Sequence, residues 1–235
     1  TVSLLKVKTV VSPSKDKLET LVKTLRHIGN QPGIVFCNFK ETIQEVSNYL
    51  TVNLIHHGCF FGGMEQMDRE RALIKFRNGT HQLIVATDLA ARGLDIPELT
   101  FIIHFQLPPR RQEFTHRNGR TARMNAEGTA YILKWVNEEL PEFIESTEVE
   151  RIKDAPTPKA PTWKTLYITG GRRDKISKGD IAGLFLKQGG LSNEQLGIIE
   201  IKQDCSYVAV PASKTNELIN TLTNSKLKTK KVRLS

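Results

Sequence analysis

Short apolar stretches alternate with amphipathic stretches along the first 145 residues of the chain. Buried strands are predicted where β-branched, aromatic and other apolar residues run together, at residues 34–36, 82–86, 101–103 and 130–133. Between these strands, apolar side chains recur at helical spacing, which predicts one helix along residues 18–28 and another over residues 66–76. Strands that alternate with helices favour an α/β fold with a parallel sheet and helices on both of its faces.

The pattern changes after residue 137. Residues 138–148 are rich in Glu and predict an acidic helix that closes the first domain. Residues 154–161 contain three prolines, and such a stretch forms a stiff, extended connector. We therefore expect three parts of the chain: a first domain over 1–150, a linker over 151–162 and a second domain over 163–235.

The second domain has the pattern β-α-β-β-α-β. Its strands are expected at residues 166–168, 198–201, 207–210 and 230–234. A first helix is expected over residues 178–187 with Ser177 as its N-cap, and a second helix from Pro211 to about residue 222. This order of elements is that of the RNA-recognition-motif (RRM) sandwich.

Composition narrows the class of protein. A hydrophobic content of 39% and a charged content of 25% are those of an ordinary globular protein. No run has the apolar length of a membrane span, and no signal peptide opens the sequence. The three cysteines are scattered, which excludes a metal-binding spacing or a disulfide framework and favours the reducing cytoplasm.

The formal net charge of +9 is unevenly distributed. Residues 1–150 contain as many acidic as basic side chains, so the entire excess lies in residues 151–235. A small domain with this excess of Lys and Arg is typical of nucleic-acid binding. A solubilising charged surface is the alternative, and charge alone does not decide between them.

Two segments carry most of the candidate chemistry. Residues 86–95 read Ala-Thr-Asp-Leu-Ala-Ala-Arg-Gly-Leu-Asp, and residues 116–123 read His-Arg-Asn-Gly-Arg-Thr-Ala-Arg. The second segment has four cationic or potentially cationic side chains, a density that suits recognition of phosphate by guanidinium groups. The first ends in an Asp that can accept a hydrogen bond from a ribose hydroxyl. Together they predict a nucleotide site, with ATP as the expected ligand.

These segments resemble motifs V and VI of the superfamily 2 helicases in their DEAD-box form. Residues 34–38 are similar to motif IV and residues 66–69 to the Q-x-x-R motif, in the order and spacing of that family. Three residues depart from its usual pattern: Asn118 replaces an aliphatic residue, Ala122 a Gly and Gly63 an Asp. The resemblance implies a RecA-like fold for about residues 1–145 and the activity of an ATP-dependent RNA helicase.

The resemblance also implies roles in the nucleotide site. Arg120 and Arg123 would be arginine fingers that stabilise charge on the γ-phosphate in the transition state, and three-residue spacing on a helix would point both the same way. His116 would link the γ-phosphate side to an acidic motif of another domain. The cofactor-binding candidates are Asp95 for the ribose, Gly93 for close backbone approach, and Arg92 for an interdomain contact. A surface helix with Arg–Glu pairs is the alternative, which the surrounding motif disfavours.

Five residues of the first domain resemble the positions that contact the RNA backbone in this family. They are Asn38, Gly62, Arg69, Thr87 and Asp88. Hydroxyls, backbone N–H groups and Arg side chains are what a sequence-independent grip on phosphates uses. Arg117 is a candidate brace of the domain.

The second domain, at residues 166–175, 178–181 and 206–210, looks like the domain appended to DbpA-type bacterial DEAD-box helicases. This implies binding to large-subunit ribosomal RNA during ribosome assembly. The candidate RNA contacts are Tyr167, Tyr207, Arg172, Arg173, Lys175, Lys178, Lys228, Lys230 and Lys231. Because Cys205 and Val210 replace the usual aromatic residues, cationic contacts should dominate over base stacking. Core burial is an equal alternative for Tyr167, and protection of an edge strand is the alternative for the lysines.

The chain lacks a G-x-x-x-x-G-K-[ST] phosphate loop and an Asp-Glu-Ala-Asp run. We therefore expect the C-terminal portion of a longer helicase, with ATP and Mg²⁺ held mainly by an N-terminal RecA-like domain of the same parent chain. The fragment alone should be inactive, and no metal site is expected in it. One alternative is a non-catalytic RNA-binding module with vestigial motifs, which intact Arg120, Arg123 and Asp95 disfavour. Another is a DNA-directed superfamily 2 helicase, which the RRM-like domain disfavours.

Overall fold

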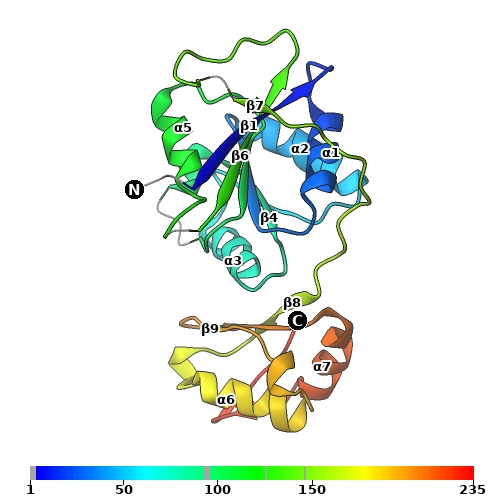
Figure 1. Cartoon of the computed structure of the whole chain (residues 1–235). Coiled ribbons are helices and arrows are strands. Elements are labelled where there is room, and N and C mark those ends of the chain that lie inside the picture. The colour runs from blue at the N-terminus through cyan, green and yellow to red at the C-terminus, as the bar shows by residue number, and fades with distance from the viewer. Residues whose placement is uncertain (1–3, 93–95, 125, 146) are drawn as a thin grey trace. The chain divides into compact units, whose positions relative to one another are not determined.

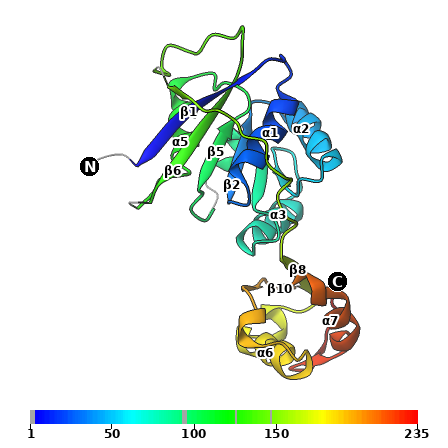
Figure 2. The same ribbon diagram turned by 45° about the vertical axis from the view of Figure 1, so that its right-hand side comes forward.

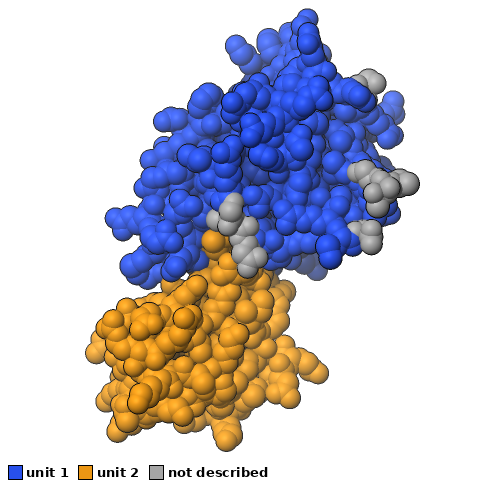
Figure 3. All heavy atoms as spheres, turned by 90° about the vertical axis from the view of Figure 1, so that its left-hand side faces the viewer, with its two compact units in different colours: residues 1–72, 82–160 blue, residues 73–81, 161–235 orange. Residues whose placement is uncertain are grey.

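The computed structural model describes residues 4–92, 96–124, 126–145 and 147–235. The chain forms two compact units, residues 1–72 with 82–160 and residues 73–81 with 161–235 (Figure 3). Within the described ranges, no helix is long and apolar enough to cross a membrane.

In the part of the chain that the structure describes, the first unit is built on a seven-stranded parallel sheet (Figure 1). The strand order is β3-β4-β2-β5-β6-β1-β7. The strands are β1 (Leu5–Ser12), β2 (Gly33–Cys37), β3 (Gly58–Phe60), β4 (Leu83–Thr87), β5 (Phe101–His104), β6 (Gly128–Trp135) and β7 (Glu148–Val149). The four predicted strands correspond to β2, β4, β5 and β6, and the predicted fold class is confirmed.

Helices cover both faces of this sheet (Figure 1, Figure 2). The helices α1 (Leu18–Ile28) and α2 (Lys40–Val52) pack on one face, and α5 (Arg111–Asn118) lies on the other. Two further helices, α3 (Gln66–Arg77) and α4 (Asp88–Ala91), follow strands β3 and β4. Because both faces are buried, the strands are apolar on both sides, which is why they read as continuous apolar runs in the sequence.

The predicted closing helix over residues 138–148 is wrong. The described residues of this stretch form turns and coil, and β7 (Glu148–Val149) pairs in parallel with β1. Pro141 has no backbone N–H to donate and disfavours helical geometry in the residue before it. The Glu138 carboxylate accepts hydrogen bonds from the Trp135 backbone N–H at 3.1 Å and from Lys17 Nζ at 3.5 Å. Glu138 therefore stabilises the turn after β6, and the Glu-rich stretch does not form a helix.

The second unit contains an antiparallel sheet with the strand order β8-β10-β9. Its strands are β8 (Trp163–Ile168), β9 (Ile199–Ile201) and β10 (Ser206–Pro211), and its helices are α6 (Lys178–Gly183), which continues as a π-helical segment through Leu184–Gln188, and α7 (Thr215–Leu222). Ser177 caps α6 as predicted, since its hydroxyl accepts from the Asp180 N–H at 3.1 Å and its N–H donates to Asp180 Oδ2 at 2.9 Å. Helix and sheet side chains share one buried core.

Two expected features of this unit differ in the structure. Pro211 is the last residue of β10, opposite Trp163, and not the first residue of the second helix; a 3-10 turn, Ala212–Lys214, follows it and leads directly into α7. The expected last strand over 230–234 is divided. Its first part, β12 (Lys230–Lys231), forms a hairpin with β11 (Lys226–Leu227), whereas Leu234 bridges to Ile168 of β8. Left-handed backbone at Lys228 (φ 57°) supports the turn that joins β11 to β12.

Candidate functional site

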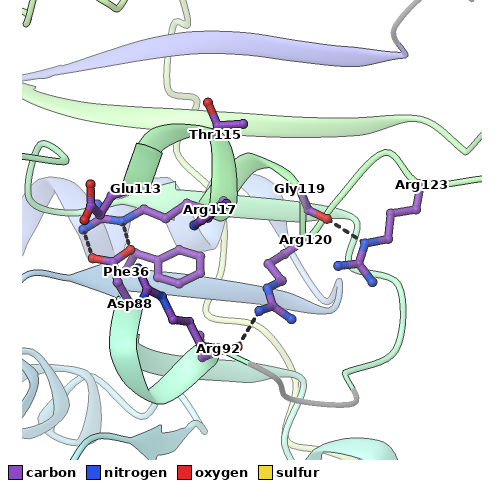
Figure 4. A pocket seen from close by; sticks show the side chains of 11 residues that line it. Phe36, Asp88, Arg92, Glu113, Thr115, Arg117, Gly119, Arg120 and Arg123 are labelled. Atoms are coloured by element: carbon purple, nitrogen blue, oxygen red, sulfur yellow. Dashed lines mark hydrogen bonds and ion pairs between the residues drawn. The ribbon is translucent and has the colours of Figure 1, made fainter. Parts of the chain in front are cut away.

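A cleft of about 480 Å³ lies in the first unit, in the region where β2 and β4 end (Figure 4). We call it the arginine cleft. Its lining residues are Phe36, Asp88, Ala91, Arg92, Glu113, Thr115, His116, Arg117, Gly119, Arg120 and Arg123. Ligands of parallel α/β sheets bind beyond the carboxyl ends of the strands, so the cleft is in the expected place. Four arginines and two carboxylates line it, which leaves an excess of positive charge.

Arg117 is the buried brace of this cleft. It is 1% exposed, and its Nε and Nη2 donate to the two carboxylate oxygens of Asp88, each at 2.7 Å. Nη2 also donates to Asn38 Oδ1 at 2.6 Å, and Nη1 donates to the Gln106 carbonyl at 3.0 Å. The guanidinium thereby ties α5 to the first residue of α4 and to the segments that follow β2 and β5. The side-chain oxygens of Asp88 and Asn38, two predicted RNA contacts, are engaged in this brace.

His104 lies behind the brace, fully buried at the end of β5. Its Nε2 donates to Asn118 Oδ1 at 2.8 Å, and its Nδ1 accepts from Arg117 Nη1 at 3.4 Å. These partners place the single ring proton on Nε2. Burial, with the Arg117 charge adding to it, lowers the pKa of His104 to about 3. The ring is therefore neutral and joins the end of β5 to Arg117 and Asn118 of α5.

Sequence reasoning missed His104 and noted Asn118 only as a departure from the usual pattern. The structure connects the two, because the Asn118 amide oxygen accepts the ring N–H that an aliphatic side chain would leave unpaired. The sequence did contain a signal for this pair: a polar residue, His104, directly follows the apolar run at residues 101–103.

Arg120 and Arg123 line the cleft, but they are not on a helix, and that prediction is wrong. The helix α5 ends at Asn118, and the chain then forms a bridge between Thr121 and Leu99, with Ala122 in left-handed backbone (φ 57°). Arg120 Nη2 donates to the Ala91 carbonyl, and Arg123 Nε donates to the Gly119 carbonyl at 2.6 Å. Backbone carbonyls of the turn and of α4 thus orient both side chains at the cleft (Figure 4).

The two guanidinium groups are close enough to influence each other. The pKa of Arg120 is lowered, first by its partial burial and then by the positive charge of Arg123. A bound anion between like charges relieves both effects, because it replaces lost hydration and opposes the repulsion. The pair is therefore suited to phosphate oxygens.

Other predicted residues lie around the rim. His116 and Arg92 are exposed at the cleft, and Glu113 is paired with Arg110. The pKa of Glu113 is lowered, mainly by its hydrogen bond with Arg110, with a smaller effect of Arg92. Gly93 and Asp95, the predicted backbone-approach and ribose residues, lie outside the described residues.

The remaining RNA candidates of the first unit follow neighbouring strands at the same edge of the sheet. Thr87 ends β4, and Gly62 follows β3 and is exposed. Arg69, on α3, places its guanidinium 5.0 Å from the Phe60 ring centre. Gly63 has φ +91°, a conformation that an Asp at this position would adopt only with strain. The edge therefore presents hydroxyl, backbone and guanidinium donors beside the arginine cleft.

In the second unit, Tyr167 and Tyr207 face each other across β8 and β10, with ring centres 5.6 Å apart. Tyr207 is 6% exposed and Tyr167 is half-buried. Most of the surface of both rings is thus buried against neighbouring residues. Base stacking by these tyrosines remains a prediction. The predicted cationic side chains are more accessible to RNA than the two rings are.

The predicted cations of this unit are exposed and come from two places, the segment after β8 and the β11–β12 hairpin. They are Arg172, Arg173, Lys175, Lys178, Lys228, Lys230 and Lys231. Lys228 Nζ lies 3.6 Å from Asp180 Oδ1 of α6, and a side chain added at Gly170 would contact Lys230. The two groups of cations therefore border one surface. Among the described residues, no group of acidic, His and Cys side chains is arranged to hold a metal ion.

Comparisons with known proteins match two separate parts of the chain. Residues 16–125 match the helicase conserved C-terminal domain, and residues 165–235 match the DbpA RNA binding domain. The chain is 32% identical to the ATP-dependent RNA helicase DbpA of Escherichia coli, over 94% of the chain and 50% of that protein, and 27% identical to DbpA of Bacillus subtilis, over 86% and 48%. It thus spans about half the length of these curated relatives.

Among solved structures, the E. coli DEAD-box protein SrmB, determined in complex with the regulator of ribonuclease activity A, is 30% identical. The match has a TM-score of 0.58 and covers 67% of this chain and 97% of that chain.

Proposed function

Since the chain belongs to the DEAD-box family of RNA helicases and carries its C-terminal helicase domain together with a DbpA-type RNA-binding domain, we propose that the arginine cleft receives the triphosphate of ATP. The observation that carries this proposal is the pair Arg120 and Arg123, both oriented at the cleft by backbone carbonyls. The ATP itself is held by an N-terminal RecA-like domain of the parent chain. In this proposal Mg²⁺ is held there too.

The residues of this chain then have separate tasks. Arg120 and Arg123 stabilise the charge on the γ-phosphate as it is transferred to water, and Arg117 keeps α5 and its following turn in place. His116 and Arg92, on the rim, contact the opposing domain. Asp95 and Gly93 are proposed to meet the ribose. The fragment alone is inactive in this proposal because it supplies only half of the site.

RNA is proposed to cross the adjacent edge of the sheet, where Thr87, Arg69 and the Gly62 main chain contact its phosphates. The cationic surface of the second unit anchors a neighbouring part of the same RNA, with large-subunit ribosomal RNA as the expected substrate. Closure on ATP and RNA would separate short duplexes during ribosome assembly. The three cysteines are free, in keeping with the cytoplasm as the proposed location.

The test is Arg120→Ala in a protein that joins this chain to its N-terminal ATP-binding domain. We expect RNA-stimulated ATP hydrolysis to fall by about 10³-fold, the effect of losing an arginine finger in other NTPases. Arg111→Ala is the matched control, because Arg111 is exposed on α5 and does not line the cleft. Equal rates in the two variants would show that Arg120 is not a finger, and unchanged RNA affinity would separate this result from loss of RNA binding.

A further inference from the structure

A second cavity lies on the first unit and shares no lining residue with the arginine cleft. Its volume is about 250 Å³, below the roughly 300–1,000 Å³ of sites for drug-sized ligands. Its lining residues are Lys23, Arg26, Lys153, Asp154 and Ala155. We propose that this cavity binds a phosphate group.

The first wall of the cavity is α1. Lys23 and Arg26 are three residues apart on this helix, so their side chains share one face. The Nε of Arg26 is buried, and no described residue accepts a hydrogen bond from it. A buried donor without an acceptor is unfavourable, and the guanidinium group is matched in shape to oxyanions. Arg26 also lines the cavity, so a rotation of its side chain toward a phosphate oxygen there would give the buried Nε the acceptor that it lacks.

The second wall is a strap, residues 148–155, which is fixed before any ligand binds. Glu150 accepts from Lys8 Nζ at 2.8 Å and from His27 Nε2 at 3.1 Å. The Lys153 backbone N–H donates to His27 Nδ1 at 3.0 Å, and Ile152 packs against the main core. Lys153 is therefore brought to the cavity by contacts that do not depend on its own charge.

Three cations and one carboxylate, Asp154, line the cavity, which leaves an excess of positive charge among the described residues. No ion pair joins Asp154 to Lys23, Arg26 or Lys153 in the described structure, and Lys23 pairs only at the exposed rim, 3.2 Å from Glu19. Cations in the last turn of a helix interact favourably with the helix dipole, and this effect alone could explain why Arg26 lies at the end of α1. The helix dipole does not explain why Lys153, which comes from the strap, lies at the same cavity. Three cations around one small cavity favour an oxyanion.

Titration of the whole chain with inorganic phosphate tests the proposal, with NMR of the Lys153, Asp154 and Ala155 amides as the readout. Sodium chloride at matched ionic strength controls for screening. We expect saturable shifts and slower hydrogen exchange of the Lys153 amide. In Arg26→Met the dissociation constant should rise about tenfold, the effect of one charge-assisted hydrogen bond. Lys153→Met should weaken binding as well.

Lys6→Met is the matched control, because Lys6 is exposed on β1 and does not line the cavity. Shifts that chloride reproduces, or equal affinity of Arg26→Met and Lys6→Met, would disprove the site. Short single-stranded RNA with and without a 5′-phosphate then identifies the source of the phosphate. Shifts with both RNAs indicate a backbone phosphodiester. Shifts with the phosphorylated RNA alone, or with inorganic phosphate alone, indicate a free or terminal phosphate.

Discussion

Arg117 and the pair Arg120 and Arg123 lie within seven residues of one another and border the same cleft, yet their surroundings are opposite. Arg117 is buried and has a carboxylate, an amide and a carbonyl as partners. Arg120 is half-buried, Arg123 is exposed, and the hydrogen bonds described for both run to backbone carbonyls, without a carboxylate. The comparison shows that one short motif contains two kinds of arginine. One kind is buried and stabilises the fold, and the other faces the cleft, where we propose that it meets a ligand.

The largest expected effect comes from removing the partner of the buried arginine. Asp88→Ala leaves the Arg117 charge buried and uncompensated, which costs about 3–5 kcal/mol in comparable cases. Urea unfolding in a Trp163→Phe background measures it, because Trp135 then reports the first unit alone. Asp68→Ala, at an exposed position of α3, is the control. A change below about 1 kcal/mol would mean that Arg117 is not held by this pair.

Acid should destabilise the first unit through His104. The unfolded ring takes up a proton below its ordinary pKa of 6.5, whereas the folded ring does so only near pH 3. The stability contributed by the neutral ring is therefore complete above pH 6.5 and is lost as the pH falls from 6.5 towards 3. This single group should contribute a slope of about 1.4 kcal/mol per pH unit. Urea unfolding of wild type and His104→Leu between pH 7 and 4.5 should show a steeper decline in the wild type.

A double-mutant cycle tests the link between His104 and Asn118. Asn118→Leu removes the acceptor of the buried ring N–H and should cost about 1–3 kcal/mol of stability. His104→Leu combined with Asn118→Leu replaces both polar partners, so the double variant should recover most of that loss. Additive losses would show that the two side chains do not depend on each other.

The smallest effect on stability should come from the ligand-facing arginines. Arg120→Ala and Arg123→Ala should each change the free energy of unfolding by less than about 0.5 kcal/mol, since both side chains lie at a solvent-accessible cleft and their described hydrogen bonds run to backbone carbonyls. The same urea measurement in the Trp163→Phe background applies. A loss as large as that of Asp88→Ala would remove the distinction between the two kinds of arginine.

The fold was predictable from sequence where burial makes the pattern simple. The strands β2, β4, β5 and β6 are covered on both faces, so they appear as uninterrupted apolar runs. The helix inferred over Arg120 and Arg123 failed because Thr121 leaves helical geometry to bridge Leu99, a tertiary contact with no local signal. The helix predicted over residues 138–148 is wrong because Pro141 interrupts helical geometry, and the surrounding Glu residues do not compensate for it.

For the cleft, sequence reasoning identified the charged residues and missed what holds them. The arginines stand in a recognisable motif, but the ring of His104 depends on Asn118, fourteen residues away. Such a pair cannot be derived from spacing, because it forms only when β5 and α5 pack together. The assignments of the rim residues to ATP and RNA remain predictions.

The position of β1 in the sheet has a consequence for synthesis on the ribosome. Leu5–Ser12 pairs along its whole length with β6, Gly128–Trp135, and with β7 on the other side. Within this sheet, β1 is made before β6, so it waits until well over a hundred further residues have been made before it can pair. Non-local parallel pairing of this kind forms slowly and leaves strand edges open in the nascent chain. Lys6 and Lys8 lie within β1, and charged side chains within a strand oppose edge-to-edge aggregation.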